Sequence, residues 1–210
     1  MRSKTIAIPH ASRCRSASVE EVPIDPSRLN AVGDLVLTEV DELRALADPG
    51  GLDLFNLVQR EGPLAVEDAC SRLRLAADTA SSHLRQLADA GLIDQDADGR
   101  WSTEARGVYF ELPDEPEAQR AARELSNTML LKYATLPSEW VRRVEPLLDV
   151  AWVRAAGLFN ARVELAPDEL RRLQADVERL LEPFANRPAK DRPAEASSVR
   201  ITAYFMPEPS

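Results

Sequence analysis

The sequence predicts an α+β fold that is mainly helical, and three observations support this. Between Thr38 and Ala90, apolar residues recur at the three- and four-residue spacing of amphipathic helices. An Asp-Gly turn within residues 97–99 then joins two short runs, as in a β-hairpin. In the second half, residues 158–165 and 199–205 alternate apolar with polar side chains, which is typical of half-buried strands.

The composition is that of a globular protein. The chain has 210 residues, of which 44% are hydrophobic and 29% charged, enough for one sizeable core or two small domains. Its uncharged apolar stretches are only a few residues long, so we expect no membrane span, no signal peptide and a cytoplasmic location. Cys14 and Cys70 are too few for a disulfide scaffold and lack the paired spacing of zinc ligands, so we expect two reduced thiols.

The net charge of -9 is unevenly distributed along the chain. Counts of Lys+Arg against Asp+Glu are 5 and 3 for residues 1–30, 6 and 15 for residues 31–105, and 15 and 17 for residues 106–210. The acidic surplus therefore lies in the first half, where a nucleic-acid-binding domain usually has a basic surplus.

Three segments are expected: a flexible arm at residues 1–33, a first domain at 34–112 and a second domain at 113–210. The arm mixes Ser, Pro and Arg without helical or strand periodicity. It carries four early cations, which could follow DNA phosphates or simply belong to a solvated tail, the more frequent case: Arg2, Lys4, Arg13 and Arg15.

Four short helices are expected before the hairpin. The first begins at Thr38, whose hydroxyl can cap it, and stops at residues 48–51 (Asp-Pro-Gly-Gly). Asp78 is the expected N-cap of the fourth helix, and Gly91 ends that helix. The second, third and fourth are expected at residues 52–61, 66–75 and 78–90.

This order of elements is that of a winged helix-turn-helix. Two motifs make the match more specific: LRALADP at residues 43–49, and S-x-H-L-x-x-L-x-x-A-G-L-I at residues 81–93. On these motifs, residues 38–105 resemble the ArsR-type winged-helix family of bacterial transcription regulators. The resemblance implies a protein that binds double-stranded DNA and regulates transcription.

The resemblance also implies that residues 78–90 are the recognition helix, which lies in the major groove. Hydroxyl groups can contact phosphates or bases, Arg85 can pair with guanine or phosphate, and Gln86 can pair with adenine. His83 could instead be a structural histidine, and the whole face could be an ordinary solvated one. The candidate DNA contacts are Thr79, Ser81, Ser82, His83, Arg85, Gln86 and Arg100.

Several residues depart from the family pattern. Ala65 and Glu67 stand where the metal-sensing branch has a C-x-C pair, so we expect no metal and no cofactor. Asp94, Asp96 and Asp98 stand in the wing, where cations usually contact DNA. An alternative function is therefore a protein-interaction or ligand-binding module that has kept the scaffold and lost DNA binding. No catalytic constellation is present, so we do not expect an enzyme.

The second domain is expected to be a C-terminal α/β extension. A long amphipathic helix at residues 115–133 suits a homodimer, although it could pack on its own chain. Further helices are expected from Pro137 and from Pro167, the latter with an apolar stripe ending at Phe184. Strands at residues 158–165 and 199–205 complete the extension, and they could run either parallel or antiparallel to each other. Six aromatic residues could line a small-molecule effector pocket or, more commonly, form core: Tyr133, Trp140, Trp152, Phe159, Tyr204 and Phe205.

Overall fold

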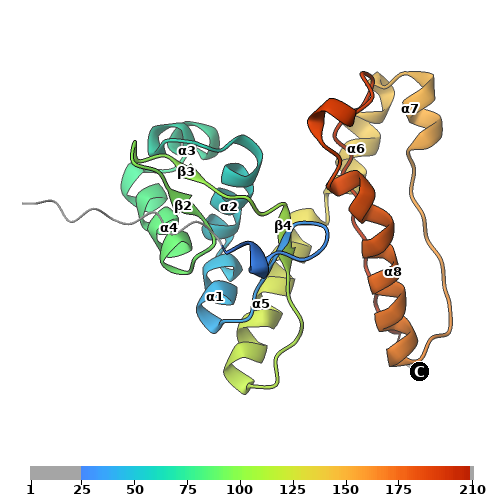
Figure 1. Cartoon of the computed structure of the whole chain (residues 1–210), viewed down its shortest axis with the longest axis horizontal. Helices are drawn as coiled ribbons and strands as arrows, with labels where there is room; N and C mark the ends of the chain where they lie inside the picture. The colour runs from blue at the N-terminus through green and yellow to red at the C-terminus, as the bar shows by residue number, and fades with distance from the viewer. Residues whose placement is uncertain (1–24, 209–210) are drawn as a thin grey trace, which may run out of the picture.

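The structure is a computed structural model that describes residues 25–208. As expected, the described chain is mainly helical with a small amount of sheet (Figure 1). The elements of the first half are η1 (Pro26–Arg28), β1 (Asp34–Val36), α1 (Val40–Ala47), α2 (Pro49–Glu61), α3 (Val66–Leu73), α4 (Ala77–Asp89), β2 (Asp94–Gln95), β3 (Trp101–Ser102) and β4 (Gly107–Tyr109). Those of the second half are α5 (Pro116–Tyr133), α6 (Leu136–Arg143), η2 (Glu145–Leu147), α7 (Val150–Ala155), α8 (Pro167–Ala185) and η3 (Ala189–Asp191).

The hydrophobic core lies entirely between Leu35 and Leu125. Helix α1 packs along α5, while α2 and α3 both pack against α4. Phe55 and Leu84 are among the largest side chains that this packing buries completely. Burying a side chain of this size stabilises the fold by about 1.5–3 kcal/mol, so this core holds α4 in place.

The expected N-capping residues of α1 and α4 are wrong. The N-cap of α1 is Glu39 rather than Thr38, and the Glu42 carboxylate accepts the Thr38 and Glu39 backbone N–H groups at 2.8 and 3.1 Å. Asp78 is not an N-cap but lies inside the first turn of α4, after the N-cap Ala76. In both cases the helix begins one or two residues away from the residue with the best capping side chain.

The break at residues 48–51 ends one helix and also begins the next. Asp48 caps α2 by accepting the Gly51 N–H at 2.9 Å, and Pro49 takes the first helical position. Helix α2 therefore starts three residues before the expected Leu52. The expected end of α2 is confirmed, because its C-cap is Gly62.

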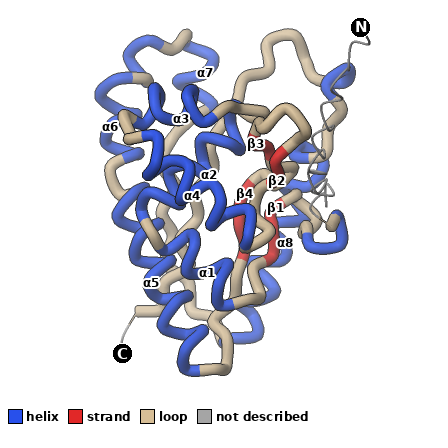
Figure 2. The backbone as a smooth tube through the Cα atoms, turned by 90° about the vertical axis from the view of Figure 1, so that its left-hand side faces the viewer, coloured by secondary structure: helices blue, strands red, loops and turns tan. Residues whose placement is uncertain are grey.

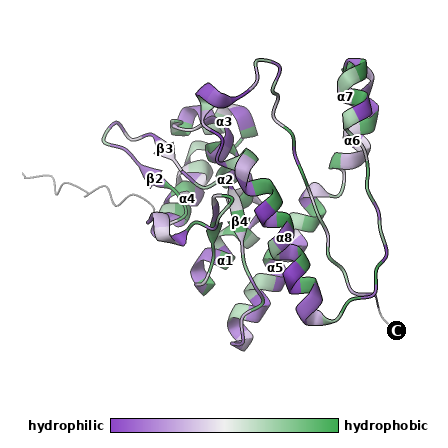
Figure 3. Ribbon diagram, turned by 45° about the vertical axis from the view of Figure 1, so that its right-hand side comes forward, coloured by the Kyte–Doolittle hydropathy of each residue, from purple (hydrophilic) through white to green (hydrophobic). Residues whose placement is uncertain are grey.

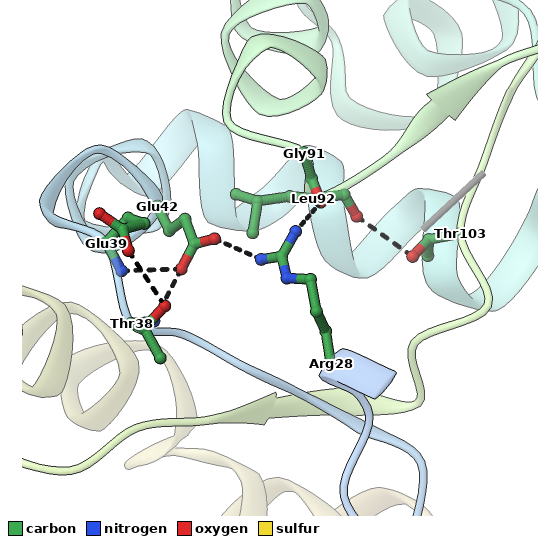
Figure 4. A network of polar contacts seen from close by, with 7 residues as sticks. All are labelled: Arg28, Thr38, Glu39, Glu42, Gly91, Leu92 and Thr103. Carbon is green, nitrogen blue, oxygen red and sulfur yellow. Dashed lines mark hydrogen bonds and ion pairs between the residues drawn. The ribbon is translucent and has the colours of Figure 1, made fainter. Parts of the chain in front are cut away.

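Part of the expected flexible arm is packed onto the domain. Residues 25–33 include η1, and Arg28 pairs with the Glu42 carboxylate while donating to the Gly91 carbonyl at 3.1 Å (Figure 4). Next to it, β1 pairs in parallel with β4 in a two-stranded sheet that was not expected from the sequence. The arm cations at positions 2, 4, 13 and 15 lie outside the described residues.

Helix α5 connects the two halves, and its first part belongs to the core. Ala118, Ala122 and Leu125 are buried against the first half, so the core crosses the boundary expected at residue 113. The second part of α5 is attached through polar contacts. Thr128 donates to the Ala47 carbonyl at 2.8 Å, and Lys132 pairs with Asp53.

The second half corrects the expected α/β extension. The helices starting near residues 137 and 167 are confirmed as α6 and α8, and α7 was not expected. The strands expected at residues 158–165 and 199–205 are wrong, because neither segment is in a strand, and Figure 2 draws both as loop. A strand needs a neighbour for its N–H and C=O groups, and alternation alone does not supply one. Among the described helices, none has both the length and the apolar character to cross a membrane.

Candidate nucleic-acid interface

Helices α3 and α4 form a compact pair that presents one face of α4. Arg74 adopts a left-handed conformation (φ 56°) and ends α3, and α4 begins three residues later. Ala80, Leu84 and Leu87 of α4 are fully buried, so the opposite side of this helix faces away from the core. The sequence dictates this orientation, because these three residues recur at a spacing of three or four.

The outward face of α4 is polar. Thr79, Ser82 and Arg85 are exposed, and so is Gln86 at the side nearer α1. The Arg85 guanidinium has no hydrogen-bond or ion-pair partner among the described residues. This set can donate to phosphate oxygens and to the acceptor atoms of guanine, and Gln86 can also pair with adenine.

Two other candidate residues, Ser81 and His83, are less exposed than the outward face of α4. Both are half-buried. The His83 ring lies against the start of α2, with Nδ1 3.4 Å from Asp48 Oδ1 and no hydrogen bond at that nitrogen. A Cβ on Gly50 would come within 2.8 Å of His83 Nε2, so a larger residue there would require the His83 ring to shift. His83 therefore packs α4 against α2 rather than extending outward.

The hairpin of β2 and β3 confirms the expected turn at residues 97–99. Asp96 Oδ1 accepts the backbone N–H groups of Asp98 and Arg100 at 3.0 and 2.8 Å, and Gly99 takes a positive φ of 79°. Asp96 is thus occupied in building the turn, whereas Asp98 is exposed at its tip. Arg100, the candidate wing cation, is exposed and donates to the Pro63 carbonyl at 3.0 Å.

Arg74 is a further candidate contact that was not expected from the sequence. It is exposed just before α4 and, like Arg85, its side chain has no partner in the described chain. Nearby Arg72 differs, because its Nε is 3.1 Å from Glu61 Oε2. A cation in the turn that precedes a recognition helix was a usable signal, since that turn lies beside the outward face.

The same surface carries exposed carboxylates. Asp78 and Asp89 lie at the two ends of α4, and Asp98 lies at the hairpin tip. On the α1 side, Asp41, Asp48 and Asp89 help to line an open hollow of about 480 Å³ that also contains Gln86. These carboxylates repel phosphate, whereas the exposed cations Arg74, Arg85 and Arg100 attract it.

Three groups with displaced pKa values lie on the β1–β4 side and on α5. Burial raises the pKa of Asp34, and the nearby Asn30 and Arg106 partly oppose this. Burial also raises the pKa of Tyr109, and the nearby Glu111 raises it further. Burial lowers the pKa of Lys132, and the positive charge of Arg200 acts in the same direction.

The described residues show no metal site, and the six aromatic residues of the second half are all at least partly exposed. Within residues 25–208, no group of three or more His, Cys, Asp or Glu side chains could hold a metal ion. The six aromatic residues of the second half are not core, because all are exposed or half-buried. Neither the hollow between α1 and α4 nor a second hollow at the end of α8 is lined by any of them.

Comparisons with known proteins give no match: no family model, no curated protein and no solved structure is significantly similar to this chain.

Proposed function

We propose that this protein is a dimeric DNA-binding transcriptional regulator of the winged helix-turn-helix type. One observation carries the proposal: α4 buries Ala80, Leu84 and Leu87 and presents an opposite face with exposed Thr79, Ser82 and Arg85. The order α3, turn, α4 and hairpin, together with the resemblance of residues 38–105 to ArsR-type regulators, supports this assignment.

In this function, α4 lies in the major groove and the β2–β3 hairpin lies beside the DNA backbone. Arg74 contacts a phosphate at the entrance of α4, and Arg85 and Gln86 reach phosphates or base edges. Two copies related by a two-fold axis place their α4 helices about 34 Å apart, which is one turn of DNA. The preferred DNA is therefore a palindrome.

A selection experiment tests this function. Purified full-length protein is mixed with a pool of random DNA duplexes at low salt, and the bound duplexes are sequenced. The expected result is a palindromic consensus with half-site centres about 10 base pairs apart. The same pool is selected with the triple variant of Thr79→Ala, Ser82→Ala and Arg85→Ala, which should recover no consensus.

A second candidate function is a protein-interaction or ligand-binding module built on the same scaffold. The exposed carboxylates of Asp78, Asp89 and Asp98 favour it, because they surround the face that would approach phosphates. If the wild-type protein enriches no duplex even at low salt, this second function replaces the first. The two are thus separated by one measurement.

A further inference from the structure

The second half of the chain exposes many large apolar side chains. No described residue after Leu125 is buried. Leu131 on α5 is 68% exposed, and Leu180 and Phe184 on α8 are 71% and 67% exposed. Phe159, in the loop before α8, is 93% exposed. We refer to Leu131, Phe159, Leu180 and Phe184 as the α5–α8 face.

This exposure has a structural origin on each helix. On the second part of α5, Thr128, Lys132 and Tyr133 contact residues of α1 and α2, which leaves Leu130 and Leu131 on the open side. Helix α8 has a stripe of apolar residues at helical spacing, and no described helix packs along it as α1 packs along α5. Figure 3 shows hydrophobic residues in green along α6, α7 and α8.

The total surface is larger than a monomer of this size needs. The chain exposes 16490 Å², whereas a compact monomer of 23.2 kDa exposes about 9,700 Å². Residues 1–24 and 209–210 can account for at most about 4,000 Å², the surface of an unfolded segment of that length. The described residues therefore hold a surplus of about 2,800 Å², which exceeds the roughly 800 Å² that each partner buries in a standard interface.

The charge of this half indicates which partner covers it. A two-fold contact brings a surface against itself, so a strongly charged surface opposes it. Residues 106–210 carry 15 basic and 17 acidic residues, whereas residues 31–105 carry 6 and 15. On α8, five acidic and three basic residues are interspersed, with ion pairs within the helix such as Arg171 with Asp168 at 2.8 Å. A second copy therefore meets little net repulsion here.

We propose that a second copy of this chain covers the α5–α8 face, with Leu180 and Phe184 of α8 and Leu131 of α5 at the contact. This inference deepens the proposed function, because it rests on the dimer and names its contact surface. Association of two copies through this face needs no DNA, so the proposed contact surface and the proposed DNA binding can fail separately.

The test measures association without DNA. Full-length protein is studied by sedimentation equilibrium over a range of micromolar concentrations, together with Leu131→Glu and Leu180→Glu. Both side chains are exposed in the single chain, so the variants should keep wild-type circular dichroism and thermal midpoints. The expected result is a wild-type dimer whose Kd rises at least about 100-fold in each variant, because a buried carboxylate is costly. Gln174→Glu adds the same charge at another exposed position of α8 and should leave Kd unchanged.

Three results would overturn the proposal. One is a wild-type protein that stays monomeric throughout the concentration range. Another is a dimer that neither Leu131→Glu nor Leu180→Glu weakens, which would place the contact elsewhere. The third is equal weakening by Gln174→Glu, which would reflect net charge rather than this surface. Selection of duplexes by the same variants then reports separately on DNA binding.

Discussion

Arg28 and Glu42 form an ion pair that joins the segment before the first domain to the start of α1 (Figure 4). Glu42 is 5% exposed and is the one buried charged residue within residues 25–208. Its other oxygen accepts two backbone N–H groups, from Thr38 and Glu39. Arg28 also donates to the carbonyl of Gly91, just beyond α4, so a single side chain connects three segments.

We predict that Arg28→Met lowers the free energy of unfolding by about 2–3 kcal/mol. Methionine keeps the apolar stem but leaves the Glu42 charge without its partner, and breaking a buried pair costs about 3–5 kcal/mol when both groups are fully buried. Arg28 is 29% exposed, which reduces the loss. Urea unfolding measures the change. Arg44→Met is the control, because Arg44 and Glu117 are both more than half exposed, and it should cost under about 0.5 kcal/mol. Equal losses in the two variants would contradict the prediction.

We predict that Gly107→Ala destabilises the protein by about 1–3 kcal/mol through overpacking. Gly107 lies opposite Asp34 in the β1–β4 pair, and an added Cβ would be 2.5 Å from Asp34 Oδ1. Asp34→Ala removes that oxygen, so the same glycine substitution should cost less in an Asp34→Ala background. The two values come from urea unfolding of the four proteins of a double-mutant cycle. Gly157→Ala is the control, since nothing lies within 4 Å of its added Cβ. If the losses in unfolding free energy from Gly107→Ala and Asp34→Ala simply add in the double variant, the proposed clash is excluded.

We predict that Asp34 makes stability depend on pH. Burial raises its pKa in the folded state above the ordinary value of 3.8. The folded state therefore holds the proton more tightly than the unfolded state, and stability falls as the pH rises through the folded pKa. Asp34→Asn lacks this ionisation, so its free energy of unfolding relative to the wild type should increase from pH 4 to pH 7. A relative stability that is constant, or that decreases, over this range would show that burial does not control the group.

We predict that Arg74 and Arg85 determine the salt dependence of DNA binding. Each phosphate contact contributes about 0.9 to the slope of log K against log salt, so Arg74→Gln or Arg85→Gln should reduce the slope of a dimer by about 1.8. Fluorescence anisotropy of a selected duplex at several salt concentrations gives the slope. Arg192→Gln removes an exposed charge far along the chain, beside η3, and should leave it unchanged. A slope unaltered in both α4-side variants would remove these residues from the interface.

We predict opposite effects for two carboxylates of the hairpin. Asp98→Lys places a cation at an exposed position of the turn and should strengthen DNA binding several-fold, with about one additional phosphate contact per protomer. Asp96→Lys should not strengthen it, because it removes the acceptor for the Asp98 and Arg100 N–H groups and disturbs the turn. Binding and thermal midpoints are measured together. If both lysines strengthen binding equally, Asp96 has no structural role.

Sequence alone predicted the helices and the hairpin well. Helices α5 and α8 have long periodic patterns with Pro at their first turn, and local rules suffice for such segments. It could not predict β1 and β4, because a parallel pair of three-residue strands depends on contacts between residues about seventy positions apart. The strands expected at 158–165 and 199–205 failed for the related reason that alternation does not supply a pairing partner.

The candidate site was predicted only in outline. The buried stripe of α4 fixed which side faces outward, so Thr79, Ser82 and Arg85 were placed on the exposed face. The position of His83 against Gly50 could not be predicted, because it depends on how α4 packs on the start of α2. The role of Asp96 in the turn was visible in principle, since aspartate often accepts backbone N–H groups two residues ahead.

The burial of Ala118, Ala122 and Leu125 has a practical consequence for dissecting the chain. A fragment ending at residue 112 would contain every element of the hairpin and of α1–α4 but would leave the groove along α1 uncovered. The smallest autonomous unit therefore extends through all of α5, to Tyr133. At 1.5 Å per residue, this helix is a rod about 27 Å long, and it contacts the first half at both ends, through Ala118 near its start and Tyr133 at its last residue.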